Sequence, residues 1–539
     1  MNSVWVIVFS AVIFILAYHL YGRFVAKLFG VDPQRKTPAH SRGDNVDFIP
    51  AKNWFVLFGH HFSSIAGAGP IVGPVIAVCI WGWVPAFLWV VLGSIFLGGI
   101  HDFGSLFISL REDGTSIGDI ASRTISRKAK LVLSIFTLLA LILVIAVFAY
   151  LGADTLVSQP EIVLPSLGIL PIAVVVGLAL YRFRLNSVAV TICALLLLAV
   201  LIVSGKAMPL SIGENGLNLW IILLLIYCFV ASITPVNYLL QPRDYLSSFL
   251  LIAGIILAFA GILISHPSMN TPAFIAFDGE LGYLWPMMFI TIACGANSGF
   301  HSLIASGTTS KQLDTEAHAK RIGFGAMILE GFLATVVIVL VVGGLSLTEF
   351  RQHLADQTSP VNLYGVAFGA MTHPILKGWG TFIALTILNA FILTTLDSAT
   401  RISRYIAEEL FQIKNRYICT LGIVFLAGLL ALGKDSAQTP LWKVIWPAFG
   451  ASNQLVAALA LLVISCWLLA KNKPDRYALI PALFMLLTSL AALGFQMIQY
   501  FQKQQYLLIG ISAVLISSAF YLCREVICVF LKREKNISC

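Results

Sequence analysis

Long apolar runs with very few charges inside them are the feature that most constrains this chain. Of its 539 residues, 59% are hydrophobic and only 11% are charged, and the mean hydropathy is +0.91. Soluble globular domains carry about 25% charged residues. Water cannot solvate this much apolar surface, so lipid must be the solvent. We therefore expect an all-α polytopic membrane protein.

About fifteen segments have the roughly 20 apolar residues that a bilayer span requires, the first near 3–29 and the last near 506–531. Their connections alternate in Lys and Arg content, and such residues concentrate in cytoplasmic loops. The 111–130 connection is rich in them, whereas the 152–167 connection has none. This alternation predicts an N-terminus outside and a C-terminus in the cytoplasm. The net charge of +9 is then mostly an orientation signal, supplemented by binding to membrane lipid, and indicates no nucleic-acid partner.

The extramembrane segments exclude several function classes. No predicted connection exceeds about 35 residues and no G-x-x-x-x-G-K-[ST] sequence occurs, so the chain has no nucleotide-binding domain and any energy should come from an ion gradient. The cysteines form no C-x-x-C pair. We expect no cofactor and no metal site.

Three predicted spans carry clusters of helix-breaking or small polar residues. They are Gly67–Pro74 in the 54–80 span, Thr234–Asn237 in the 217–240 span and Gly295–Ser302 in the 283–307 span. Backbone freed at bilayer depth is tolerated only where protein or a watery cavity satisfies it. The first two clusters would open two five-span halves, and an odd number of spans makes such halves inverted. Broken helices at matching positions indicate a transporter site, although small residues also serve close helix packing.

Ionisable residues inside predicted spans are functional candidates by default. His61, next to His60, is either a pH-sensitive gate or an interfacial histidine. Asp102 is either a proton carrier or the partner of a cation such as Arg243. Glu330 is either protonated in transit or paired across the bundle.

Two further charged pairs lie near predicted helix ends. Asp397 and Arg401 are spaced i and i+4 and can pair on one helix face. We interpret them as a structural or gating pair at the inner mouth. Arg243 and Asp244 are interpreted as structural.

Five segments together resemble one known family, the carbon starvation protein A (CstA) family, grouped with the amino acid–polyamine–organocation transporters. They are His60–Pro70, Thr234–Leu246, Gly295–His301, Thr395–Arg401 and Trp446–Gln454. The resemblance implies a LeuT-like 5+5 inverted repeat core with extra N- and C-terminal helices. The corresponding ranges are 1–52 for the first extra helix and loop, 53–215 and 216–413 for the two halves, and 414–539 for the C-terminal helices.

The resemblance also implies a carrier of the bacterial inner membrane that takes up peptides or pyruvate under carbon starvation by proton symport. A substrate carboxylate needs donors, and bare amides at Gly67–Gly69 would supply them. The candidate substrate-binding residues are Ser63, Ser64, Gly67, Ala68, Gly69, Thr234 and Asn237. By analogy with related carriers, Asn297, Ser298 and Ser302 join His61, Asp102 and Glu330 as candidates for ion or proton coupling. The substrate itself and the oligomeric state stay open.

Two other functions remain as alternatives. A channel would show repeated pore motifs or charged rings, and none is evident. An intramembrane serine hydrolase is suggested by Ser298 and His301, but Gly295 is one residue too far away for a G-x-S-G elbow.

Overall fold

The computed structural model describes residues 2–44, 47–213, 216–355, 359–434 and 440–537. Its α-helices are α1 Ser3–His19, α2 Tyr21–Phe29, α3 Pro38–Ser41, α4 Trp54–Ile65, α5 Gly69–Trp81, α6 Trp83–Leu92, α7 Gly99–Arg111, α8 Ile117–Thr124, α9 Arg127–Ser158, α10 Val163–Gly177, α11 Ser187–Ala207, α12 Gly216–Ile233, α13 Leu240–Ser265, α14 Phe289–Thr291, α15 Ala293–Asn297, α16 Gly299–Gly307, α17 Gly325–Gly344, α18 Leu347–Ala355, α19 Pro360–Leu376, α20 Gly380–Phe411, α21 Arg416–Leu432, α22 Leu441–Ala470, α23 Arg476–Gln502 and α24 Tyr506–Ile537. One short hairpin pairs β1 Asp278–Gly279 with β2 Gly282–Tyr283.

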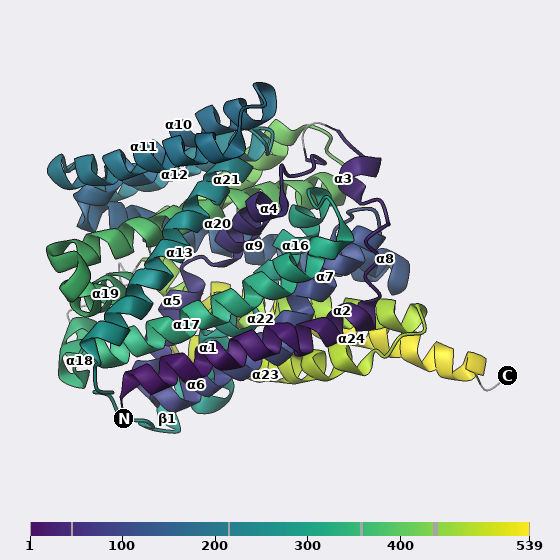
Figure 1. Ribbon diagram of the computed structural model, residues 1–539. Coiled ribbons are helices and arrows are strands. Elements are labelled where there is room, and N and C mark those ends of the chain that lie inside the picture. Colours follow the sequence, from purple (N-terminus) through teal and green to yellow (C-terminus); the bar gives the residue numbers. More distant parts are fainter. Residues whose placement is uncertain (1, 45–46, 214–215, 356–358, 435–439, 538–539) are drawn as a thin grey trace.

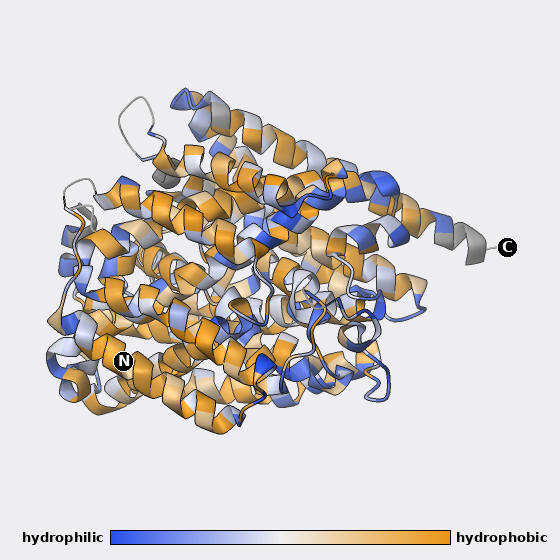
Figure 2. Cartoon of the chain, turned by 90° about the horizontal axis from the view of Figure 1, so that it is seen from above, coloured by the Kyte–Doolittle hydropathy of each residue, from blue (hydrophilic) through white to orange (hydrophobic). Residues whose placement is uncertain are grey.

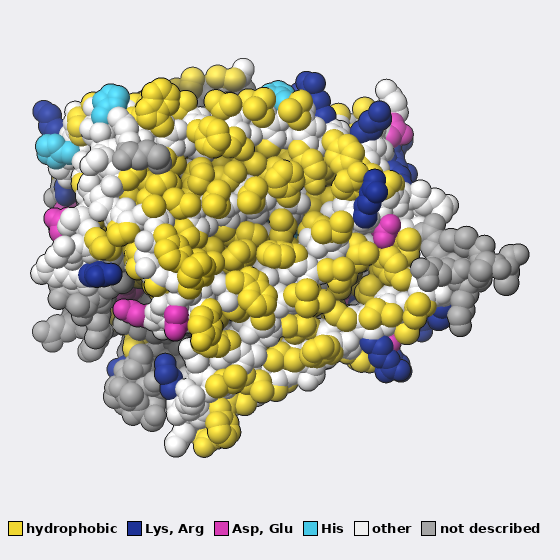
Figure 3. All heavy atoms as spheres, turned by 90° about the horizontal axis from the view of Figure 1, so that it is seen from below, with side chains coloured by type: hydrophobic (Ala, Val, Ile, Leu, Met, Phe, Trp, Pro, Cys, Tyr) yellow, Lys and Arg dark blue, Asp and Glu magenta, His cyan; other side chains and the backbone are white. Residues whose placement is uncertain are grey.

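The long helices run side by side across the molecule, and most connections gather at its two ends (Figure 1). Apolar residues dominate the helices along their length (Figure 2). On the face shown in Figure 3, hydrophobic side chains cover the middle and charged side chains lie mainly toward the two ends. Such an apolar surface between two polar ends suits a bilayer. The prediction of an all-α polytopic membrane protein is confirmed.

The predicted count of fifteen spans is not confirmed. In the described ranges, twelve helices are long and apolar enough to cross a membrane, and a bent pair brings the number to thirteen. The difference has two sources. The 283–307 segment is divided into short helices, and α21, at 17 residues, falls below the usual span length.

The first broken span is the pair α4 and α5, which are bent by 42° at the link Ala66–Ala68. Asn53 caps α4 by accepting the N–H of Val56 at 2.9 Å. Pro70 lacks an N–H and occupies the first turn of α5, where no helical partner is required. The sequence Gly67–Pro70 therefore stops one helix and starts another, as predicted.

The second broken span contains a π-helical turn at Leu284–Met288, then α14, α15 and α16, with extended backbone at Ser298. It lies directly against the first. A Cβ on Gly73 would stand 2.3 Å from the carbonyl oxygen of Thr291, and one on Gly69 would stand 2.4 Å from Cβ of Cys294. Glycine in α5 is thus what allows the two broken spans to touch.

The break predicted at Thr234–Asn237, inside the 217–240 span, is wrong. Helix α12 ends at Ile233 and α13 begins at Leu240, so Thr234–Asn237 belongs to a connection between helices. Pro235 ends a helix here rather than kinking one. The division into halves at 53–215 and 216–413 rested partly on this break and stays a prediction.

Helices α9 and α20 pack along each other beside the first break. Gly152 of α9 faces Ile392 and Asn389 of α20, and Gly67 faces Thr395 of α20 and Phe148 of α9. The link between α4 and α5 is therefore enclosed by protein, which is the condition for irregular backbone at membrane depth.

Candidate functional site

The link Ala66–Ala68 and the start of α5 are fully buried. The N–H of Gly67 donates to the carbonyl of Ile65 at 2.8 Å, so the expectation of a bare amide is wrong there. Gly69 is the first residue of α5, and its amide has no acceptor one turn earlier. Beside the link, the hydroxyl of Thr395 is buried without a hydrogen-bond partner. The Gly69 amide and the Thr395 hydroxyl, which lies against Gly67, are therefore the candidate donors for an anion.

The two predicted serines of α4 point away from the link, toward α13. The hydroxyl of Ser63 donates to the carbonyl of Asp244 at 2.8 Å, and that of Ser64 lies 3.3 Å from both the Asp244 carboxylate and the Ser398 hydroxyl. These bonds already use the donor hydrogen of both hydroxyls. In this arrangement they hold α4 against α13 and α20.

Thr234 and Asn237 lie far from the broken backbone. The hydroxyl of Thr234 donates to the carbonyl of Val230 at 2.8 Å. The backbone oxygen of Asn237 lies against Gly177 at the end of α10. The structure therefore does not bring these two residues together with Gly67–Gly69.

Four fully buried residues form what we call the histidine–carboxylate cluster: His101 and Asp102 of α7, His301 of α16 and Glu330 of α17. Asp102 lies 2.7 Å from Nδ1 of His101 and 2.8 Å from Nδ1 of His301. Nε2 of His301 lies 3.2 Å from Oε2 of Glu330. That contact is within ion-pair range but is not aligned as a hydrogen bond. Two predicted coupling residues, Asp102 and Glu330, are thus joined through one histidine.

His61 borders this cluster from α4. Its Nδ1 lies 2.8 Å from the hydroxyl of Thr309, and its Nε2 has no hydrogen-bond partner. His61 is completely buried in the protein, and its role as a gate or as an interfacial histidine stays a prediction.

The three residues predicted from the second broken span differ in what they offer. Both polar atoms of the Asn297 carboxamide are buried and without a hydrogen bond. The hydroxyl of Ser298 is engaged with Asn453 of α22 at 3.2 Å, and that of Ser302 donates to the carbonyl of Gly299 at 2.7 Å. Only Asn297 keeps free ligand atoms in this arrangement.

A second buried group, which we call the arginine cluster, lies on another face of α4. It consists of His60 of α4, Tyr227 of α12, Arg243 and Asp244 of α13, and Asp397 of α20. Arg243 donates to both carboxylates, to the Tyr227 hydroxyl and to the carbonyl of Leu393. Nδ1 of His60 lies 2.6 Å from Asp244. Every guanidinium nitrogen has a partner.

The predicted pair of Asp397 with Arg401 is wrong. Asp397 pairs with Arg243 at 2.5 Å. Arg401 donates to the carbonyls of Ala231 and Thr234 and lies 3.2 Å from Asp47. The i and i+4 spacing allows Asp397 and Arg401 to pair, but each bonds elsewhere. Asp397 bonds to Arg243 on α13, and Arg401 bonds to Asp47 in the 42–53 connection. Arg243 lies in the first turn of α13, at a helix end as predicted, and is completely buried.

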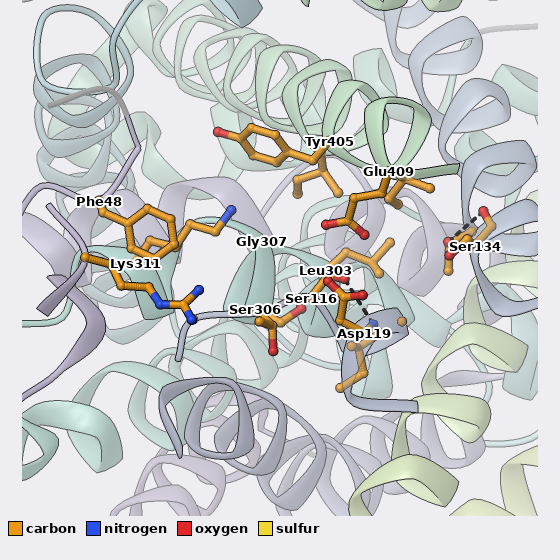
Figure 4. A pocket seen from close by; sticks show the side chains of 18 residues that line it. Phe48, Ser116, Asp119, Ser134, Leu303, Ser306, Gly307, Lys311, Tyr405 and Glu409 are labelled. Atoms are coloured by element: carbon orange, nitrogen blue, oxygen red, sulfur yellow. Dashed lines mark hydrogen bonds between the residues drawn. The ribbon is translucent and has the colours of Figure 1, made fainter. Parts of the chain in front are cut away.

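A polar cavity of about 230 Å³ lies at the end of the bundle where α8, α9, α16 and α20 meet. Figure 4 shows Lys311, Asp119 and Glu409 pointing into it, with Leu303 and Ser306 of α16 on its wall. Since His301 is on the same helix as that wall, α16 connects the cavity to the histidine–carboxylate cluster.

Sequence reasoning missed four residues of these sites. His301 was considered only as a hydrolase base, and its ring bonds to Asp102 instead of Ser298. Arg243 was interpreted as structural, but its bonds to Asp397 and Tyr227 were not anticipated. Thr395 and Asn453 lay within the segments used for the resemblance but carried no charge to mark them. Within the described residues, no three His, Cys, Asp or Glu side chains converge in a way that could hold a metal ion.

Apolar helices, two broken spans in contact and buried charged clusters define a multi-pass membrane protein built like a carrier. A profile of the family "Carbon starvation protein CstA" matches residues 2–352 and 347–492, and the chain belongs to this family. It is 33% identical to the peptide transporter CstA of Escherichia coli (strain K12) over 91% of this chain and 80% of that protein. It is 31% identical to the pyruvate/proton symporter BtsT of the same organism, over 92% and 82%.

Among solved structures, the chain resembles the crystal structure of MhsT in complex with L-phenylalanine. The TM-score is 0.48 at 13% identity, with 89% of this chain and 98% of that chain covered.

Proposed function

We propose that this protein is a secondary active transporter that takes up small carboxylate nutrients, peptides or pyruvate, by proton symport across a bacterial inner membrane. The observation that carries the proposal is the contact between two broken spans, with the buried polar groups of Thr395 and Asn297, which have no hydrogen-bond partner, beside them. Buried polar groups normally have partners. Groups left without one next to interrupted helices suit a passenger and its coupling ion. The names of the relatives supply the substrate classes.

In this proposal the substrate carboxylate binds at the start of α5. The amides of Ala68 and Gly69 and the hydroxyl of Thr395 are its donors, and the positive end of the α5 dipole lies behind them. Ser63 and Ser64 would reach the substrate only after release from Asp244. Asp102, Glu330, His61 and Asn297 would serve the coupling ion.

The hydroxyl of Thr395 gives the cleanest test of the substrate site. Thr395→Val removes the hydroxyl with little change of shape, so we expect KM to rise about tenfold, the equivalent of one hydrogen bond of about 1.4 kcal/mol. Thr386→Val is the matched control, because this hydroxyl on the same helix only donates to the carbonyl of Phe382. An equal KM for both variants and the wild type would reject the site.

Glycine replacement tests the same site sterically. Gly67→Val and Gly69→Val should abolish uptake while membrane insertion is retained, because an added Cβ would strike Thr395 or Cys294. Uptake at the wild-type level in either variant would contradict this placement.

The function is tested with purified protein in liposomes. Saturable uptake of labelled pyruvate, dipeptides, tripeptides or amino acids, driven by an inward proton gradient and abolished by a protonophore, is the expected result. Ohmic current would instead identify a channel, and labelling by a fluorophosphonate would identify a serine hydrolase.

The charge distribution supports an orientation with the N-terminus outside and the C-terminus in the cytoplasm. Arg111, Lys130 and Lys311 then lie on the cytoplasmic side, and the polar cavity beside α16 becomes the inner mouth. Labelling of single cysteines added before α1 and after α24 by a membrane-impermeant maleimide tests this, and reaction of the C-terminal cysteine in intact cells would reverse the assignment.

A further inference from the structure

The geometry of the histidine–carboxylate cluster points to one atom pair within the proposed coupling site. We propose that the coupling proton binds between Nε2 of His301 and the carboxyl group of Glu330, with Asp102 as a positioning residue that fixes the imidazole ring. This inference rests on the proposed function. It adds the identity of the proton carrier, a histidine that no sequence pattern indicated.

The hydrogen bonds of Asp102 determine which nitrogen can exchange a proton. A carboxylate only accepts hydrogen bonds, so the ring nitrogens at 2.7 and 2.8 Å, Nδ1 of His101 and Nδ1 of His301, both carry hydrogen. A neutral imidazole has one N–H. Nε2 of His301 is therefore the atom that gains or loses the second proton.

The surroundings of Nε2 make one proton necessary in this arrangement. Oε2 of Glu330 lies 3.2 Å away, and both side chains are completely buried. Without a proton, a carboxylate would face a nitrogen lone pair with no other hydrogen-bond partner, and an uncompensated buried charge is strongly unfavourable. With one proton, the pair is either imidazolium with carboxylate or imidazole with carboxylic acid.

The side chains around the pair argue against a metal cation. Within the described residues, no three His, Cys, Asp or Glu side chains are placed so that they could hold a metal ion. The other titratable groups that interact with His301, Glu330 or their partner Asp102 are His101 on α7, His61 on α4 and Cys294 on α15. None of them bonds to either atom of the pair in the described structure.

Release of the proton requires water at the pair. The N–H bond on Nε2 forms with a proton taken from water on one side of the membrane. It breaks when water on the other side reaches the pair after α16 and α17 separate from α4 and α7. Because α16 also lines the polar cavity, opening of that cavity is the step that would admit water.

The test compares proton-driven uptake with exchange in liposomes. His301→Gln and Glu330→Gln should lose accumulation driven by a pH gradient and substrate-induced proton flux, measured with an entrapped pH-sensitive dye. Both should retain exchange of labelled for unlabelled substrate at equal pH. Asp102→Asn should retain coupling with a displaced pH profile. Glu161→Gln is the matched control, since Glu161 pairs with Lys206 in a half-exposed ion pair.

Wild-type proton flux in both His301→Gln and Glu330→Gln would overturn the inference while leaving the transporter intact. No proton-dependent uptake by the wild-type protein would instead refute the proposed function. If the variants fail to fold, an infrared measurement on the wild-type protein tests the pair instead. Substrate-induced loss of the infrared C=O band of a protonated carboxyl group, or of the imidazolium bands, supports the pair, and no change in either contradicts it.

Discussion

The arginine cluster and the histidine–carboxylate cluster lie on different faces of α4 and are equally buried, yet they differ in how completely their hydrogen bonds are made. Arg243 has partners for all its nitrogens. Glu330 has no hydrogen bond on either oxygen, and three histidines, His61, His101 and His301, each keep a bare Nε2. Arginine also stays charged at any accessible pH, whereas histidine titrates near neutrality. From this difference we assign the first cluster to holding helices together, and we propose that the second changes its protonation during transport.

The largest effect on stability is expected from Arg243→Met. The substitution leaves Asp244 and Asp397 buried without their cation, and breaking such a pair costs about 3–5 kcal/mol. Unfolding of the detergent-solubilised protein, followed by tryptophan fluorescence, should show a strongly lowered Tm. Arg416→Met is the control, because Arg416 is only partly buried, at the start of α21, and bonds to the neighbouring Tyr417 hydroxyl. If Arg243→Met lowers Tm no more than the control does, the arginine cluster does not hold the helices together.

The adjacent histidines of α4 give a matched pair of substitutions, and their expected effects on stability are intermediate in size. His60→Leu removes a donor 2.6 Å from the Asp244 carboxylate, and a hydrogen bond to a charged group contributes about 1.5–3 kcal/mol. His61→Leu removes only a contact with the Thr309 hydroxyl, at about 1 kcal/mol. The same fluorescence assay should rank His60→Leu below His61→Leu in Tm, and the reverse order would contradict the assignment of roles.

Glu330→Gln should change stability by less than about 1 kcal/mol, because the amide of the new side chain can donate to Nε2 of a neutral His301, so the contact at 3.2 Å keeps a hydrogen bond. An unchanged Tm combined with lost proton coupling would show that Glu330 serves coupling, whereas Arg243 serves stability. A Tm loss as large as that of Arg243→Met would show that Glu330 is a structural residue.

The smallest effect concerns Asp47, in the connection outside the spans, which pairs with Arg401. Burial alone would raise the pKa of Asp47, but Arg401, Lys311 and Arg404 together hold the pKa below its usual value of 3.8. Its stabilising contribution is therefore present above 3.8 and is lost as pH falls through the lower folded-state pKa. Asp47→Asn should lower Tm at neutral pH and flatten the decline of Tm with acidification. An identical pH profile would exclude this ion pair as a source of stability.

Sequence reasoning predicted those parts of the fold that depend on local chemistry. Apolar runs identified the membrane helices, and Gly67–Pro70 predicted the first break because glycine and proline act within one turn. The Thr234–Asn237 break failed because Pro235 ends a helix as readily as it kinks one, and only the neighbouring helices decide which. The same limit applies to Asp397 and Arg401. Their spacing permitted an ion pair, but Arg243 and Asp47, distant in sequence, are better placed. His301 was missed because its role depends on two carboxylates from other helices.

The glycine contacts between α5 and the second broken span have a mechanical consequence. Gly73 lies so close to the Thr291 carbonyl that not even a methyl group fits between them, so water cannot pass between the two half-helices at this point. A motion that opens a route to one side of the membrane is therefore expected to carry α5 and the second broken span together. A motion at either break would then be transmitted to the other.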